Sequence, residues 1–169
     1  ELKVIRIYPL IFILLWSSAF ITTKPIVDNS DPFAALAFRF FFVALGFYLF
    51  SFYLNQSLIT NKRKIAESVL SGVLFHGFYL GGVFYSISIG MPVGIAALIV
   101  TLQPILTNIL SGPILDEKIT TQQWIGVLLG FTGASLVLGL DIGSGIPLLG
   151  LIATIIALLS ITTVSYTHL

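Results

Sequence analysis

The sequence predicts an all-α integral membrane protein, a polytopic helical bundle. Charged residues make up 9% of the 169 residues, against about 25% in soluble domains. Hydrophobic residues make up 57% and mean hydropathy is +1.06, more apolar surface than a soluble domain of this size can bury. Backbone groups in lipid must be paired within each segment or in a closed barrel. The apolar runs lack the alternation of barrel strands, so we expect helices.

Six apolar segments come close to the roughly 20 residues that a membrane helix needs. The expected spans are 8–27, 32–54, 65–89, 92–115, 122–140 and 146–163. The first span is not a cleavable signal, because it is long and ends in Lys24-Pro25 rather than in a small-residue cleavage site.

Turn-forming residues separate each span from the next. Asp, Asn, Gly and Pro in these breaks end one helix and start another. The breaks, in order, are "DNSDP" at 28–32, "NQSLITNKRK" at 55–64, "GMPVG" at 90–94, "DEKITTQ" at 116–122 and "DIGSGIP" at 141–147.

Basic residues are placed on one side of the predicted spans. The loops 28–31, 90–91 and 141–145 contain no lysine or arginine. Basic loops stay in the cytoplasm, so we expect a cytoplasmic N-terminus. The expected location is the inner or plasma membrane of a bacterial cell. The basic residues on the cytoplasmic side are Lys3, Arg6, Lys62, Arg63, Lys64 and Lys118.

The two remaining cations, Lys24 and Arg39, fall inside predicted spans. A charge at the bilayer centre costs about 2.5–3.5 kcal/mol on the insertion scale. Both lie in the outer half, where they are able to face one electropositive cavity that receives a carboxylate. Two alternatives stay open. Lys24 can extend to the surface and pair with Asp28 one turn on, and Arg39 can bond backbone carbonyls.

Polar residues recur at helical spacing on three spans. They form the sets Ser17, Phe20, Lys24, Asp28; Gly72, His76, Tyr79, Val83, Ser86; and Val100, Gln103, Thr107, Ser111. These faces are expected to point inward, where they either line a cavity or form interhelical hydrogen bonds of about 0.6 kcal/mol each.

Particular residues have more than one interpretation. His76, near the midplane, either carries a coupling proton or is a fixed hydrogen-bonding group. Pro104 bends its helix and frees a carbonyl beside Gln103 for substrate, or only for packing. Trp16 either fills the core or forms a cavity wall. Gly126 and Gly130 form a close-packing motif. The candidate substrate-binding residues are Trp16, Lys24, Arg39, His76, Tyr79, Gln103 and Pro104.

Connectivity predicts an inverted repeat. Five spans are an odd number, so a second copy of the 8–140 unit enters the membrane upside down. Inverted repeats are typical of secondary transporters.

The first hairpin resembles the EamA-type branch of the drug/metabolite transporter superfamily. It shows that family's Trp, small residues and Phe, then Lys, Pro and Arg-Phe, as Trp16, Ser17, Ser18, Phe20, Lys24, Pro32, Arg39 and Phe40. The fourth and fifth spans resemble it through Pro104, Asp116, Glu117, Gln123, Gly126 and Gly133. Family members usually have ten helices, so the chain is expected to be the N-terminal half.

The resemblance implies three regions. Residues 8–140 form the first five-helix repeat, and 141–163 start the second repeat with a truncated sixth helix. The ending "VSYTHL" resembles a translated sequencing adapter, so 164–169 are expected to be a non-native tail.

The leading functional interpretation is a secondary transporter that exports small metabolites, amino acids or drug-like compounds by alternating access, either with a proton coupled through His76 or without one. Substrate class and direction come from the resemblance. A structural or assembly membrane protein is an alternative. An intramembrane enzyme is disfavoured, because the spans contain neither a nucleophile paired with a base nor a metal cluster. The expected partners are a small-molecule substrate, the lipid bilayer and a second copy of the chain, with no cofactor and no nucleic acid.

Overall fold

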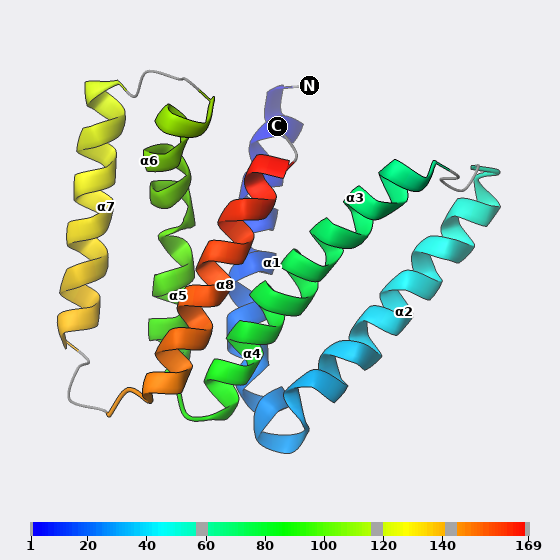
Figure 1. Ribbon diagram of the computed structural model, residues 1–169, viewed down its shortest axis with the longest axis horizontal. Coiled ribbons are helices and arrows are strands. Elements are labelled where there is room, and N and C mark those ends of the chain that lie inside the picture. Colours follow the sequence, from blue (N-terminus) through cyan, green and yellow to red (C-terminus); the bar gives the residue numbers. More distant parts are fainter. Residues whose placement is uncertain (1, 57–60, 116–119, 141–144, 168–169) are drawn as a thin grey trace.

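The computed structural model describes residues 2–56, 61–115, 120–140 and 145–167. These residues fold into helices that run alternately up and down, with connections at the two ends of the bundle (Figure 1). The expected all-helical membrane fold is confirmed. The helices are α1 Leu2–Asn29, α2 Pro32–Tyr53, α3 Lys62–Gly72, η1 Val73–Leu80, α4 Gly81–Ser88, α5 Val93–Thr101, α6 Gln103–Leu115, α7 Thr121–Leu140 and α8 Leu148–Thr167.

Within the described residues, five helices are long and apolar enough to cross a membrane. They are Ile7–Asn29, Pro32–Tyr53, Lys62–Ser88, Val93–Leu110 and Leu148–Tyr166. The remaining predicted span, 122–140, is occupied by α7, a helix of 20 residues that is not one of these five. Its crossing of the membrane stays a prediction. The last helix, α8, extends through Thr167 and so includes the start of the predicted tail.

Capping residues start the helices where the turn chemistry predicts. Asp31 accepts hydrogen bonds from the backbone N–H groups of Phe33 and Ala34, at 3.0 and 2.8 Å, and Pro32 occupies the first helical position. Asn61 caps α3 in the same way, accepting from Arg63 N–H at 2.9 Å. These short caps allow α1 and α2, and then α2 and α3, to reverse direction.

The third span is one continuous helix with an unusual middle. Its eight central residues, η1, form a π-helix between the α-helical segments α3 and α4. A π-helix has i→i+5 bonds and more residues per turn than an α-helix, so the side chains drift around the axis. The predicted single inward stripe is therefore wrong in part. Tyr79 and Val83 are buried, whereas His76 is exposed.

The fourth span is interrupted, as Pro104 predicts. The first part, α5, ends at Thr101, and α6 begins at Gln103. Between them the Leu102 N–H bonds the carbonyl of Ile99 at 3.1 Å, three residues back rather than four. Proline lacks the N–H that would continue the α-helical hydrogen bonds, so the helix is interrupted in the turn that precedes Pro104.

The core lies where α8 packs along η1 and α4. The two helices approach closely at Gly82, where a Cβ would lie 2.8 Å from the Ala153 carbonyl oxygen and 3.2 Å from the Ala157 Cβ. Two buried hydroxyls bond their own helix. Ser86 donates to Val83 O, and Thr154 donates to Gly150 O, both at 2.8 Å. The interface is therefore apolar and close-packed, with these hydroxyls satisfied.

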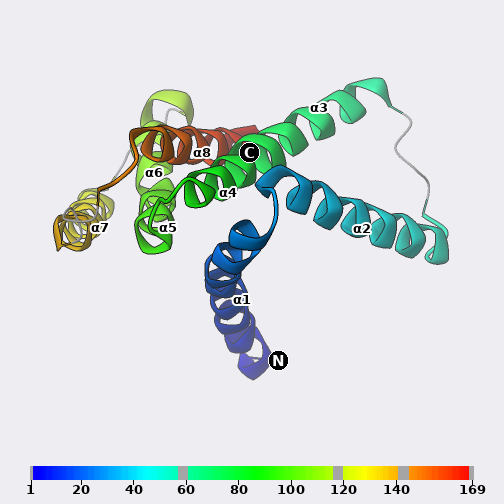
Figure 2. The same cartoon turned by 90° about the horizontal axis from the view of Figure 1, so that it is seen from below.

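In contrast, α1 and α2 diverge from this core (Figure 2). Both helices contact α4 and each other near the connection that joins them. Leu36 is the one buried residue of α2. The long third span forms the remaining side of the space between α1 and α2, and this space contains the candidate site.

Candidate functional site

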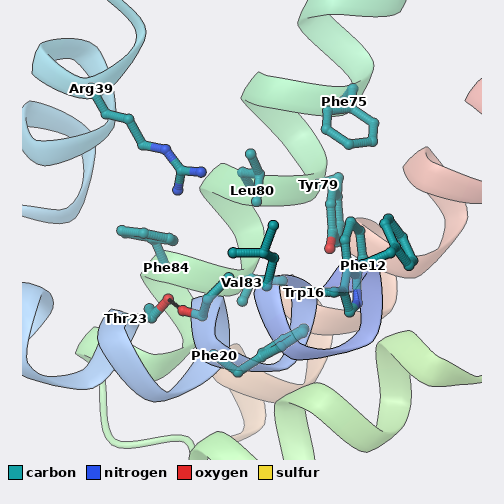
Figure 3. Close-up of a pocket in the computed structure, with 12 residues that line it drawn as sticks. Phe12, Trp16, Phe20, Thr23, Arg39, Phe75, Tyr79, Leu80, Val83 and Phe84 are labelled. Atoms are coloured by element: carbon teal, nitrogen blue, oxygen red, sulfur yellow. Dashed lines mark hydrogen bonds between the residues drawn. The ribbon is translucent and has the colours of Figure 1, made fainter. Parts of the chain in front are cut away.

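A cavity of about 230 Å³ lies between α1, α2 and the third span. Six residues of α1 line one side, Arg39 enters from α2, and the π-helical segment and α4 supply the rest (Figure 3). The lining residues are Phe12, Leu15, Trp16, Ala19, Phe20, Thr23, Arg39, Phe75, Tyr79, Leu80, Val83 and Phe84.

Aromatic rings form one end of the cavity. The Trp16 indole is stacked with the Tyr79 ring, with 6.4 Å between centroids and 10° between planes. Phe12 stacks on Trp16 at 5.6 Å, and Phe75 meets Tyr79 edge-on at 5.2 Å. Phe12 and Trp16 are four residues apart on α1, as Phe75 and Tyr79 are on η1. The cavity therefore has a continuous aromatic wall contributed by two helices.

The Arg39 guanidinium lies at the opposite end and points toward the centre of the cavity (Figure 3). Its neighbour Phe40 lies with its ring centroid 6.0 Å from the guanidinium carbon. Among the described residues, Arg39 forms no hydrogen bond and no ion pair. The open alternative of a structural bond to carbonyls is thus not what the structure shows, and the five N–H donors of Arg39 remain available.

The other polar groups of the cavity are a hydroxyl on α1 and the donors of the aromatic wall. Thr23 is buried and donates to the Ala19 carbonyl at 2.7 Å, which leaves its oxygen lone pairs free to accept. The Trp16 indole N–H and the Tyr79 hydroxyl are donors at the aromatic end. No lining residue carries a carboxylate. The cavity is therefore electropositive and suited to a ligand with an anionic group.

Lys24 is not part of this cavity. Its ammonium donates to both carboxylate oxygens of Asp28, with 2.6 Å to Oδ2. Both side chains are about half exposed, at 52% and 48%. The face of α1 that meets the cavity carries Trp16 and Thr23, and Lys24 lies beside that face. Of the two alternatives, the structure shows the pair with Asp28.

His76 lies next to the cavity rather than in its lining. Its ring packs between the rings of Phe40 and Phe75, with centroids 4.4 and 5.0 Å away. The imidazole therefore contacts both α2, through Phe40, and the aromatic wall, through Phe75. Phe75 lies between His76 and Tyr79 and contacts both rings, and Tyr79 lines the cavity.

Gln103 and Pro104 lie elsewhere, on the fourth span. The Gln103 amide donates to the Ser165 hydroxyl of α8 at 2.8 Å, and Pro104 is exposed. The structure therefore brings together Trp16, Arg39 and Tyr79, with His76 adjacent, and separates Lys24, Gln103 and Pro104 from them. The partner of Gln103 belongs to the predicted tail, and the origin of that tail stays a prediction.

Comparison with known proteins identifies the family. The family model for the EamA-like transporter family matches residues 5–139. The chain belongs to the EamA-like transporter family. It is thus a multi-pass membrane transporter of the drug/metabolite type, and its family consists of transporters rather than enzymes. Neither the curated proteins nor the solved structures gave a match.

The cavity of this EamA-like transporter also contains residues that the sequence reasoning missed. Phe12, Thr23 and Phe75 are the clearest cases. A signal for two of them was present, because each phenylalanine precedes a predicted site aromatic by four residues and shares its helix face. Thr23 had no such signal, since a threonine beside a lysine on an apolar helix is usually bonded to its own backbone.

Proposed function

We propose that the chain forms half of a secondary transporter that exports small metabolites by alternating access. In this proposal the cavity between α1, α2 and the third span is the substrate site, and Arg39 receives an anionic group of the substrate. The observation that carries the proposal is the guanidinium itself, which lies in an apolar span with no ion pair among the described residues.

The surroundings of Arg39 support this assignment. A charged side chain inside a span is costly and is usually retained for function. The opposite wall of the cavity is built on a π-helical segment, and such segments are frequent at functional sites. An unpaired cation beside such a segment is what we expect of a site that binds an anionic solute.

The remaining features of the proposal concern the whole transporter. A second, inverted five-helix half supplies the opposing wall, and α8 is its first helix. A homodimer of five-helix halves is the alternative way to complete the site. Proton coupling is assigned to His76, because its ring connects α2 with the π-helical segment and imidazole titrates near neutral pH. The membrane is the inner or plasma membrane of a bacterium.

The test replaces Arg39 in the complete transporter, in proteoliposomes with and without a proton gradient. Arg39→Gln should reduce flux per folded molecule about tenfold or more, because a charge-assisted bond contributes about 1.5–3 kcal/mol. Arg39→Lys should recover little, since an ammonium lacks the bidentate fork.

The matched control is Arg63→Gln, which removes an exposed cation paired with Glu67 outside the cavity. Its flux should stay near that of the unchanged protein. Folded yield comes from size-exclusion profiles, so that a folding defect is separated from a transport defect. Unchanged flux per folded molecule in Arg39→Gln would remove Arg39 from the substrate site.

A further inference from the structure

We infer that the cavity selects aromatic acids, meaning ligands with a flat ring at one end and a single carboxylate at the other, over amino acids with the same ring. This inference rests on the proposed function, because it takes the cavity as the substrate site. It goes further by naming the class of ligand and the class that is rejected.

The aromatic end determines the ring. Trp16 and Tyr79 present near-parallel faces, and Phe12 and Phe75 extend this wall on either side. Rings packed on such a wall gain about 0.5–1.5 kcal/mol per aromatic pair beyond the area they bury. A branched aliphatic body gains only the buried area. The wall therefore favours a planar ligand.

The charged end determines the carboxylate. Arg39 points into the cavity from the other side, and a guanidinium binds a carboxylate through two parallel N–H···O bonds. The aromatic wall lies on α1 and η1, and the cation lies on α2. The packing of these helices therefore sets the separation between the two ends of the cavity. A ligand that fills both ends must therefore have an aromatic ring at one end and its negative charge at the other.

The described residues that line this half of the site include no acidic residue, and this determines which ligands the half rejects. In an α-amino acid the ammonium is on the carbon next to the carboxylate. Docking the carboxylate on Arg39 thus places the ammonium beside the guanidinium, where like charges repel. Two rings also lie at this end: Phe40, which already faces the guanidinium, and Phe84, which lies beside Arg39 in Figure 3. A ring attracts a cation but carries no full negative charge, so neither ring cancels the repulsion from the guanidinium. Of the two aspartates near this end of α1, Asp28 is already paired with Lys24, and Asp31 caps α2 by accepting from the N–H groups of Phe33 and Ala34.

The volume limits the part of the ligand that this half of the site holds. Drug-sized molecules occupy pockets of about 300–1,000 Å³, whereas this cavity measures about 230 Å³. The space suits one ring, or two fused rings, with a short acidic side chain. Phenylpropionate and indole-acetate have this form.

Trp16 provides a direct readout of binding. This chain contributes two tryptophans to the complete transporter. Trp124→Phe, together with phenylalanine at every tryptophan of the second half, leaves Trp16, in the cavity wall, as the sole indole. The complete transporter with these changes is reconstituted in lipid nanodiscs and titrated with 3-phenylpropionate, phenylalanine and 2-phenylethylamine. These three share the ring and differ in charge. Indole fluorescence should report the acid binding at least tenfold more tightly than the amino acid, with the amine weakest.

Two variants show where the preference originates. Adding Arg39→Gln should abolish the preference for the acid, whereas Arg63→Gln, outside the cavity, should leave it intact. Equal or tighter binding of phenylalanine or of the amine overturns the inference, as does the lack of response to all three. Failure of the transport proposal is seen separately, as acid-selective binding without flux in proteoliposomes.

Discussion

Arg39 and Lys24 are both cations in apolar helices, but their surroundings give them different roles. The Lys24 ammonium has a carboxylate one turn away and lies near the end of α1, about half exposed. Arg39 has no carboxylate partner among the described residues and points into a cavity. The same net charge is therefore compensated locally in one case and left for a ligand in the other.

We expect Lys24→Gln to have a small effect. Exposed ion pairs of this i,i+4 type contribute about 0.5 kcal/mol or less, and Lys24 does not line the cavity. Thermal unfolding in detergent and flux in proteoliposomes should both stay close to those of the unchanged protein. The exchange Lys24→Asp with Asp28→Lys rebuilds the pair in reverse and should preserve folded yield. A large loss of flux in Lys24→Gln, at normal folded yield, would instead place Lys24 in the transport path.

At the scale of elements, α4 approaches α8 closely at a glycine. Gly82 allows it, because the Ala153 carbonyl occupies the place that a side chain would take. The sequence predicted the close-packing glycines on α7 instead, at Gly126 and Gly130. Gly130 does meet Ile105, but nothing lies within 4 Å of the Cβ position at Gly126. Spacing alone indicates that glycines share a face, not which helix that face meets.

Gly82→Ala should destabilise the fold, and Gly72→Ala should not. The added Cβ at Gly82 would stand 2.8 Å from a backbone oxygen, so the two helices must separate, at a cost of about 1–3 kcal/mol. At Gly72, in the same span, the Cβ meets nothing within 4 Å, and alanine is the better helix former by about 1 kcal/mol. Unfolding temperatures in detergent compare the two. A Gly82→Ala variant as stable as Gly72→Ala would contradict the α4–α8 contact.

Other elements show how far the sequence could predict the structure. The break before Pro104 was predictable, because a missing N–H has one local consequence. The π-helical segment was not, since a helix of 3.6 residues per turn was assumed throughout the third span, and this assumption put His76 on the stripe of Tyr79. The residues of the cavity were predictable from the sequence only in part. Trp16, Arg39 and Tyr79 have chemistry that indicates a site, whereas the role of Phe12 depends on which helix α1 meets.

For the whole molecule, the alternating helices bring the basic residues to one end. Figure 1 shows the N-terminus and the start of α3 at the same end of the bundle, and α3 begins with Lys62, Arg63 and Lys64. The opposite end carries the connection from α1 to α2, with Asp28 and Asp31. This asymmetry supports the predicted cytoplasmic N-terminus.

Single cysteines test this orientation, because the chain has none of its own. Gln56→Cys follows α2 at the basic end, and Ser30→Cys follows α1 at the other, and both positions are exposed. In intact cells a membrane-impermeant maleimide should label Ser30→Cys and spare Gln56→Cys until the membrane is opened. Labelling of Gln56→Cys but not of Ser30→Cys in intact cells would show that the orientation is opposite to the predicted one.

The weak packing of α2 makes ligand binding and helix docking one thermodynamic process. Arg39 is carried by the helix that has a single buried residue, Leu36, while the aromatic wall is carried mostly by α1 and the third span. In the proposed function, a solute that bridges the two ends therefore joins α2 to its neighbours. By linkage, the solute stabilises the docked state by RT ln(1 + [L]/Kd), about 2.7 kcal/mol at a concentration of 100 Kd. Release of the solute then returns α2 to the few contacts that its own sequence provides.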